Sequence, residues 1–240
     1  LHQVIVPKRV LKEEMANDSI ARLDGSSIKG FAEVQDSDLV LKPDPNTYAV
    51  LPWSSGQSKT ARLICDVYWG FSRGRLERDP RYIAQRAEDC LRSEGFTTSY
   101  WGPELEFFVF EKVKWDVLNS YRGQSYYISS REASWNFEAQ AGYPIRFKDG
   151  YYSSTPQDTL IELRNECVKI LEDYFGIPCE AHHHEVATAG QCEIIAYRDT
   201  LTSMADNVMT CKFVVKNVAK SMNLVATFMP KPIFGDNGSG

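Results

Sequence analysis

The chain has 240 residues, of which 43% are apolar and 25% are charged, a composition typical of a globular protein rather than a disordered one. Its net charge of −5 and its pI near 5.5 argue against a general attraction to nucleic acid or to anionic membranes. No apolar run approaches the roughly 18 residues that span a bilayer, so we expect a soluble protein with neither nucleic-acid nor membrane partners.

Short β-type runs alternate with turn signals through the first part of the chain. Turn-rich clusters such as residues 24–27 and 42–46 separate these runs. The pattern predicts a small, mostly β domain over residues 1–77. The runs lie at residues 3–7, 39–42, 48–52 and 61–69.

The next part of the chain begins with clear helix signals. Asp79 can cap a helix, Pro80 suits its first position, and Gly95 is typical of a residue just past its end. Residues 100–110 are strongly strand-like. Residues 111–150 are polar but rich in tyrosine and tryptophan, and we expect an insertion packed on the surface.

A second helix is indicated between Thr155-Pro156 and Gly176. A hairpin is expected at residues 179–196, followed by a third helix at 201–222 and a last strand at 224–228. Strands mixed with long helices, without regular βαβ alternation, predict the α+β class, with the second domain running over residues 78–240.

Six cysteines are spread along the chain, and no two form a Cys-x-x-Cys pair, which argues against zinc or thioredoxin-type chemistry. Cys90, Cys167 and Cys211 lie in helical patterns, where a reduced thiol behaves as a small apolar side chain. We expect a reduced, cytoplasmic protein. Because the chain starts at Leu1 without a signal peptide and stops directly after a strand-like run, we also expect part of a longer polypeptide.

Glu104 and Glu106 stand in an otherwise apolar run. On a strand, residues two apart point to the same face, so these carboxylates would repel one another and lose hydration unless a cation lies between them. A solvent-exposed position at the edge of a sheet explains the pair equally well when it is taken alone.

Glu185 and Glu193 form a second pair. A three-residue hairpin loop at 188–190, with Gly190 in the left-handed conformation, would place the two glutamates directly opposite one another. Like charges in opposed positions are destabilising, so the arrangement needs a reason, and a bridging divalent cation supplies one. Oxygen ligands favour Mg²⁺ or Mn²⁺ over zinc, and a group of glutamates on neighbouring strands fits phosphoryl chemistry.

Three consecutive histidines precede Glu185. Strand alternation places His183 on the face of Glu185, and His182 and His184 on the opposite face. A histidine on a strand is more often a buried supporting residue than a ligand. Of the three, His183 is the best candidate for direct contact with substrate or phosphate.

Several stretches, taken together, resemble glutamine synthetase, the type I glutamate–ammonia ligase. Each could occur by chance, but they follow the family's order along nearly the whole chain, and the hairpin motif with the terminal loop is specific. They are DGSSIKGF at 24–31, DPRYIAQRAE at 79–88, GPELEFFVF at 102–110, HHEVATAGQCEI at 183–194 and MPKPIFGDNGSG at 229–240.

The resemblance implies a β-grasp-like domain followed by part of a catalytic domain with a curved antiparallel sheet backed by helices. It implies ATP-dependent transfer of a phosphoryl group to the side-chain carboxylate of glutamate, followed by attack of ammonia. Glu106, Glu185 and Glu193 would hold one Mg²⁺ or Mn²⁺. Glu104 would be one ligand of a second ion, whose other ligands would lie after Gly240.

The same resemblance assigns substrate contacts. Asp24 would bind ammonium and accept its proton, with Ser27 beside it, while Tyr151 and Glu185 would belong to the same pocket. Active sites would form between subunits, because the family takes the Asp24 loop from a neighbouring subunit. This implies a homo-oligomer, a dodecamer of two stacked hexameric rings.

Contacts to glutamate and nucleotide complete the implied site. Asn237 and Gly238 would contact glutamate, and Glu180 and His183 would lie near the nucleotide. Arg198 stands where an aromatic contact to adenine is usual, and its guanidinium group could stack on the base instead. Two alternatives stay open: a γ-glutamyl ligase that uses a polyamine or another amine, and an inactive homologue that only assembles.

Overall fold

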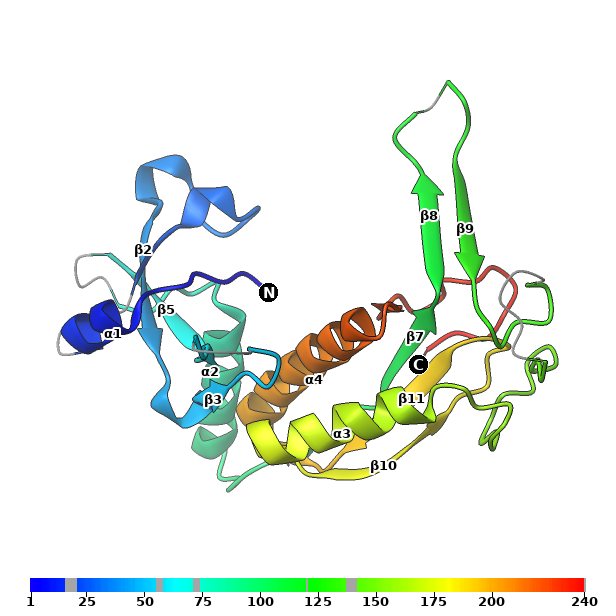
Figure 1. The fold of residues 1–240 in the computed structure, drawn as a ribbon. Helices are drawn as coiled ribbons and strands as arrows, with labels where there is room; N and C mark the ends of the chain where they lie inside the picture. Colours follow the sequence, from blue (N-terminus) through cyan, green and yellow to red (C-terminus); the bar gives the residue numbers. More distant parts are fainter. Residues whose placement is uncertain (16–20, 55–57, 71–73, 120, 137–141, 240) are drawn as a thin grey trace. The chain divides into compact units, whose positions relative to one another are not determined.

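The computed structural model describes residues 1–15, 21–54, 58–70, 74–119, 121–136 and 142–239, the side chains of 12–15 aside. The chain divides into two compact units, each described here by itself (Figure 1). The first unit comprises Leu1–Trp101 with Asp199–Asp206, and the second comprises Gly102–Arg198 with Asn207–Gly240. Within the described residues, no helix is both long and apolar enough to cross a membrane.

An antiparallel sheet with β2 (Asp38–Pro43) in the middle is the centre of the first unit. β1 (Ala21–Asp24) pairs with one edge of β2, and β5 (Cys65–Trp69) pairs with the other. A second, two-stranded ladder joins β3 (Ala49–Val50) to β4 (Ala61–Arg62). The predicted strands at 39–42 and 48–52 are therefore confirmed, and the predicted run at 61–69 is two strands. The core under the sheet consists of Leu39, Val67 and Leu76, with Leu23, Phe31, Leu41 and Trp69 packed against it.

One sequence prediction for this unit is wrong, and one strand has no sequence prediction. Residues 3–7 form no strand, because no strand in the described part of the chain pairs with them, and helix α1 (Lys8–Met15) follows directly. The sequence pattern also missed β1, which ends in the turn signal at Asp24. That residue ends the strand and caps the following 3-10 turn, its Oδ1 accepting the N–H of Ser26 at 3.0 Å.

Helix α2 (Pro80–Ser93) begins and ends as its sequence predicts. Asp79 Oδ1 accepts the N–H of Arg81 at 3.1 Å, which satisfies one of the free N–H groups of the first turn. Gly95 follows the helix with a φ of 89°, a conformation that glycine adopts without steric cost.

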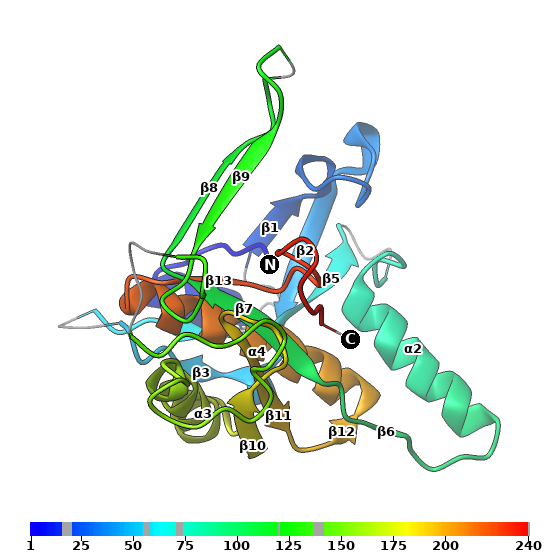
Figure 2. The ribbon, with the colours of Figure 1, turned by 90° about the vertical axis from the view of Figure 1, so that its right-hand side faces the viewer.

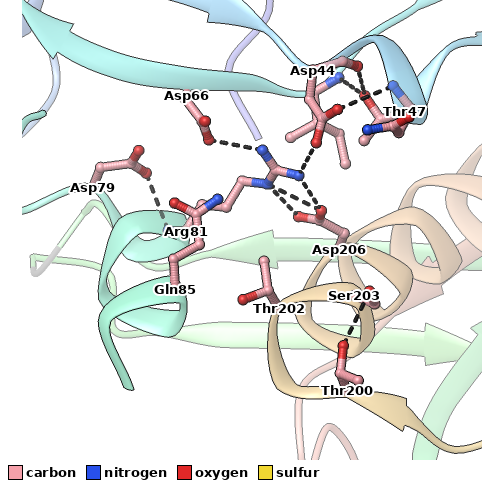
Figure 3. Close-up of polar contacts among 12 residues, drawn as sticks. Asp44, Thr47, Asp66, Asp79, Arg81, Gln85, Thr200, Thr202, Ser203 and Asp206 are labelled. Carbon is pink, nitrogen blue, oxygen red and sulfur yellow. Dashed lines mark hydrogen bonds and ion pairs between the residues drawn. The ribbon is translucent and has the colours of Figure 1, made fainter. Parts of the chain in front are cut away.

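Arg81 on α2 binds aspartates from three other segments of the first unit (Figure 3). Its Nη2 lies 2.6 Å from Asp44 Oδ2, and its Nη1 lies 2.7 Å from Asp66 Oδ1. Asp206, on the part of α4 (Leu201–Ser221) that belongs to this unit, accepts from Nε at 3.0 Å and from Nη2 at 2.9 Å. We call these four residues the Arg81 cluster. A single planar guanidinium group thus connects α2, two loop or strand positions and the start of α4.

A four-stranded antiparallel sheet is the centre of the second unit (Figure 2). Its order is β10 (Cys179–His184), β11 (Gln191–Ala196), β7 (Leu105–Phe110) and β13 (Val225–Thr227). The predicted hairpin, third helix and last strand are confirmed as β10–β11, α4 and β13. The predicted strand at 100–110 is divided into two strands, because Pro103 has no N–H to donate to a neighbouring strand. The residues before Pro103 form β6 (Tyr100–Trp101), which pairs with β12 (Asp199–Thr200) in the first unit.

Helix α3 (Ile161–Phe175) packs against β10 and β11. Its C-terminus is as predicted, since Gly176 adopts a φ of 64° and donates to the last carbonyls. Its start is not at Thr155-Pro156. The N–H of Thr159 donates to Glu132 and that of Leu160 donates to Asp158, so buried carboxylates hold the preceding residues outside the helix. All six cysteines are free, and Cys167 and Cys211 are buried in α3 and α4.

The insertion at 111–150 is not simply packed on the surface. Its first part is a hairpin, β8 (Lys112–Asp116) and β9 (Ser125–Ser129), which extends well beyond the end of β7 (Figures 1 and 2). Val113 and Ile128 at its base pack against buried Phe108 and Phe110, whereas Trp115 further along is 68% exposed. Residues 120 and 137–141 of the insertion lie outside the described residues.

Candidate metal centre

Three acidic or histidine side chains form a row across the sheet of the second unit. Glu193 on β11 pairs with His183 on one side and with Glu106 of β7 on the other. Residues that pair directly across antiparallel strands point to the same face. The row therefore lies on one face, and the opposite face carries His182 and Cys192, both bonded to Arg164 of α3.

Glu185 joins this row through a turn that is longer than the sequence predicts. We expected Glu185 opposite Glu193 across a three-residue loop, but the strands end at His184 and Gln191 and the turn spans residues 185–190. The register shifts by two, which keeps the same face and places Glu185 diagonal to Glu193. Gly190 adopts the predicted left-handed conformation, with a φ of 71°, and a Cβ there would lie 2.1 Å from the carbonyl oxygen of Val109.

The three side chains of His183, Glu185 and Glu193 converge. His183 Nδ1 lies 3.4 Å from Glu185 Oε1, and His183 Nε2 lies 3.2 Å from Glu193 Oε2. One ligand atom from each of the three residues lies within 4.8 Å of the others, which is a spacing that could hold a metal ion. We call these three residues and Glu106 the glutamate cluster.

The charges of this cluster are unbalanced. Burial, followed by repulsion from Glu185, Glu104 and Glu106, raises the pKa of Glu193 to about 7. A divalent cation among these carboxylates would remove the repulsion. The donors are mostly carboxylate oxygens with one imidazole, a set that suits Mg²⁺ or Mn²⁺, so the residues present fit such an ion.

The turn at 185–190 is held on one side by residues 148–152. Gly150 donates its N–H to Val186 O at 3.2 Å, and Tyr152 donates to His184 O at 3.1 Å. A Cβ on Gly150 would lie 2.5 Å from Glu185 O, so this close approach requires glycine. These bonds tie the backbone of the turn to residues 150–152.

The chain is similar to known proteins over nearly its whole length. Two profiles of one family match it, "Glutamine synthetase, beta-Grasp domain" over residues 1–70 and "Glutamine synthetase, catalytic domain" over residues 77–240. The chain belongs to the glutamine synthetase family.

Individual relatives agree with the family profiles. A glutamine synthetase of Sulfolobus acidocaldarius is 48% identical over 240 residues, which cover 100% of this chain and 50% of the relative. One of Frankia alni is 42% identical over 241 residues, covering 98% of this chain and 50% of the relative. The chain spans about half the length of the curated relatives it matches.

A solved structure also matches. The cryo-EM structure of Plasmodium falciparum glutamine synthetase superimposes with a TM-score of 0.82 at 27% identity, covering 97% of this chain and 44% of that one. The predicted α+β fold is therefore confirmed, with a β-grasp domain followed by part of a catalytic domain.

Other predicted site residues of this glutamine synthetase family member belong to the glutamate cluster or lie beside it. Glu106 is half-buried and accepts the side-chain N–H of Gln191 at 3.1 Å. Glu104 is exposed just before β7, and its charge contributes to the raised pKa of Glu193. The Tyr151 ring, 57% exposed, meets His183 edge-on at 5.8 Å between centroids.

The glycine-rich segment that carries Asn237 and Gly238 also reaches this region. Gly238 O accepts from the side chain of Gln191 at 3.4 Å. Buried Asp236 accepts the N–H and the hydroxyl of Thr188, both at 3.0 Å, which ties the segment to the turn at 185–190. The structure thus brings the predicted glutamate contacts beside the predicted metal ligands.

Glu180 and Arg198 lie outside the three-residue group. Glu180 is exposed where the pairing of β10 with β11 is irregular, and exposed Arg198 follows β11 with its guanidinium carbon 5.8 Å from the centre of the Tyr197 ring. His183, predicted near the nucleotide, lies between two glutamates.

Asp24 and Ser27 belong to the first unit. Asp24 Oδ1 accepts the N–H and hydroxyl of Ser26 at 3.0 and 2.6 Å, and its Oδ2 accepts the hydroxyl of Ser27 at 2.7 Å. These bonds, those from Ser26 first, lower the pKa of Asp24, so the carboxylate is ionised at neutral pH. The turn is tightly packed, since a Cβ on Gly25 would lie 2.6 Å from a methyl carbon of Leu39.

Sequence reasoning missed several supporting residues of the site. Gln191 and Asp236 lie within the motifs at 183–194 and 229–240, so the sequence does point to these two residues. The sequence predictions for these motifs concern their neighbours instead. Glu132, which binds both His184 and Gly190, stands in the polar insertion, where no pattern points to it.

Proposed function

We propose that the full-length protein is an ATP-dependent glutamate–ammonia ligase. It forms γ-glutamyl phosphate from glutamate and ATP, and ammonia then displaces phosphate to give glutamine, ADP and phosphate. The observation that carries the proposal is the convergence of His183, Glu185 and Glu193, next to Glu106, on one face of the sheet. Family membership supports the same reaction.

Glu106, Glu185 and Glu193 would hold one Mg²⁺ or Mn²⁺, and Glu104 would contribute to a second ion. When bound, such ions supply positive charge that stabilises a phosphoryl group in transfer. The protein's part is to hold the carboxylates fixed before binding. The turn at 185–190 supports this role, because its backbone bonds to residues 148–152 leave Glu185 little freedom to move.

Asn237 and Gly238 would bind glutamate, supported by their link to the turn through Asp236. Glu180, His183 and Arg198 would contact ATP. The guanidinium group of Arg198 suits stacking on adenine, because it is planar and exposed.

Asp24 would bind ammonium and accept its proton, with Ser27 fixing the carboxylate. Its lowered pKa supports the binding of ammonium, because an ionised carboxylate attracts a cation at neutral pH. Tyr151 and Glu185 would complete the ammonium pocket.

The proposed domains are residues 1–77 and 78–240, and the gap between the two matched profiles, at residues 71–76, supports this boundary. We further propose a cytoplasmic homo-oligomer, a dodecamer of two stacked hexamers whose active sites lie between subunits. Glutamate, ammonium and ATP would be its small-molecule partners.

A coupled assay of ADP release tests the function in the full-length protein. With glutamate, ATP and Mg²⁺ present, we expect turnover with ammonium and little with putrescine or ethylamine. Asp24→Asn should lower ammonium-dependent turnover by about 10²-fold or more, the usual scale for a group that moves a proton, with unchanged ATP binding.

Preference for putrescine or ethylamine would instead favour a γ-glutamyl ligase for other amines. Absence of both turnover and Mn²⁺ binding would favour an assembly-only homologue. Unchanged turnover in Asp24→Asn would show that Asp24 is not the proton acceptor.

A further inference from the structure

Glu132 is a buried carboxylate behind the metal-binding turn. Its side chain is 1% exposed and accepts hydrogen bonds on both oxygens. Oε1 accepts the N–H and the hydroxyl of Thr159, at 2.9 and 2.8 Å. Oε2 lies 2.8 Å from the N–H of Gly190 and 3.1 Å from Nε2 of His184. A buried carboxylate with this many partners occupies one position.

The partners on Oε2 are the two ends of the turn that carries Glu185. Gly190 ends the turn, and His184 directly precedes it. His184 Nδ1 lies 2.6 Å from Glu185 O and 2.9 Å from Gly150 O. Because carbonyl and carboxylate oxygens only accept, both ring nitrogens carry a hydrogen: Nδ1 donates to the two carbonyls and Nε2 donates to Glu132 Oε2. Glu132 therefore connects through one imidazole ring to the backbone of Glu185, and directly to the residue before Gln191.

A carboxylate suits this position better than an amide of the same shape. Both oxygens face N–H or O–H donors, and a carboxylate accepts on both sides. A glutamine would have to direct its NH₂ group at the N–H of Gly190 or at the N–H of Thr159. Either orientation leaves a buried donor facing another donor, which is costly.

We propose that Glu132 is a positioning residue for the metal-binding turn, holding its two ends so that the Glu185 carboxylate faces Glu193 before a metal ion binds. This inference rests on the proposed function in one respect, since it takes Glu185 and Glu193 to be metal ligands. Groups that orient metal ligands from behind typically change metal affinity by about 10–100-fold when they are removed.

Mn²⁺ titration of the metal-free, full-length protein, followed by electron paramagnetic resonance, tests the proposal. In Glu132→Gln we expect affinity to fall by about tenfold or more. Amide hydrogen exchange over residues 186–190 of the metal-free protein should be faster. Glu88→Gln is the matched control, because Glu88 likewise accepts the N–H and the hydroxyl of a threonine, Thr202, and has no bond to the turn among the described contacts, so the Mn²⁺ affinity of this variant should equal that of the wild type.

Wild-type affinity and exchange in a folded Glu132→Gln variant would overturn the proposal. If that variant does not fold, Thr159→Val decides, because it removes only the hydroxyl donor to Oε1. We expect a smaller loss of affinity there, and an unchanged value would count against Glu132. Failure of the wild type itself to bind Mn²⁺ would refute the proposed metal site instead.

Discussion

Each unit contains a group of neighbouring carboxylates, and the two groups differ in what balances their negative charge. In the Arg81 cluster, Asp44, Asp66 and Asp206 surround one guanidinium group of the same chain (Figure 3). In the glutamate cluster, Glu185 and Glu193 converge on His183, which carries charge only if it is protonated. The first arrangement contains its own cation, whereas the second is suited to receive one.

The pKa values of the carboxyl groups reflect this difference. Burial raises the pKa of Asp44, but the bonds from Arg81 and Asn46 together outweigh it and the net pKa is lowered. Burial outweighs the same arginine at Asp206, whose pKa is raised, so one guanidinium group does not fully compensate three aspartates. At Glu193 burial and its neighbours act in the same direction and raise the pKa to about 7. Arg81 partly compensates the aspartates of the first cluster, whereas the glutamates of the second repel one another, and a bound cation would relieve that repulsion.

Removal of the built-in cation should have the largest effect. Arg81→Gln removes the guanidinium group that three mostly buried aspartates share, although Asp66 keeps its ion pair with Arg75, and we expect a loss of about 2–4 kcal/mol in the free energy of unfolding. Urea unfolding of the full-length variant measures this loss. Arg92→Gln is the matched control on the same helix, because its ion pair with Asp89 is exposed and should contribute less than about 0.5 kcal/mol. Equal effects of the two substitutions would refute the comparison.

In the glutamate cluster, by contrast, ionisation of a carboxylate should destabilise the folded protein when no metal ion is bound. Between pH about 4.5 and 7 the folded, metal-free protein keeps a proton on Glu193 that the unfolded chain has released. The folded state therefore binds more protons, and its stability falls as pH rises through this window, by about 1–3 kcal/mol in total. Urea unfolding in a chelator at pH 5, 6, 7 and 8 measures the slope.

Glu193→Gln is the control for this slope, because it keeps the shape of the side chain and removes its charge. The variant should lose the contribution of Glu193 to the slope and be more stable than the wild type at pH 8 without metal. Mg²⁺ at pH 8 should stabilise the wild type and stabilise the variant less. A variant with the wild-type slope would show that Glu193 is not the group that titrates.

Local signals predicted those parts of the fold that depend on a few neighbouring residues. The Asp79-Pro80 start of α2 and the Gly176 end of α3 are backbone effects within one turn, so the sequence contains them in full. The start of α3 depends on Glu132, which lies 27 residues from its partner Thr159, and no local pattern reports such a bond. The predicted strand at residues 3–7 is wrong for the same reason, since a strand needs a partner and no strand in the described part of the chain pairs with these residues.

The same distinction between local sequence signals and contacts between distant residues applies to the candidate site. Strand alternation placed His183, Glu185 and Glu193 on one face correctly, even though the predicted register was shifted by two residues, because a shift of two preserves the face. The length of the turn depends on contacts with Gly150, Glu132 and Asp236, which are distant in sequence. The face that these three side chains share could therefore be predicted, and the contacts that hold the turn could not.

The substitution with the smallest expected effect on stability, Arg81→Lys, distinguishes the contribution of charge from that of geometry in the Arg81 cluster. Arg81→Lys keeps the positive charge, but a lysine ammonium is a point charge and cannot reach aspartates on two sides as a planar fork does. We expect a loss of about 1 kcal/mol, well below that of Arg81→Gln, measured by the same urea unfolding. If Lys restored full stability, net charge alone would hold this cluster. If Lys were as damaging as Gln, the directed bonds from Nε, Nη1 and Nη2 would account for the whole effect, because the charge would still be present.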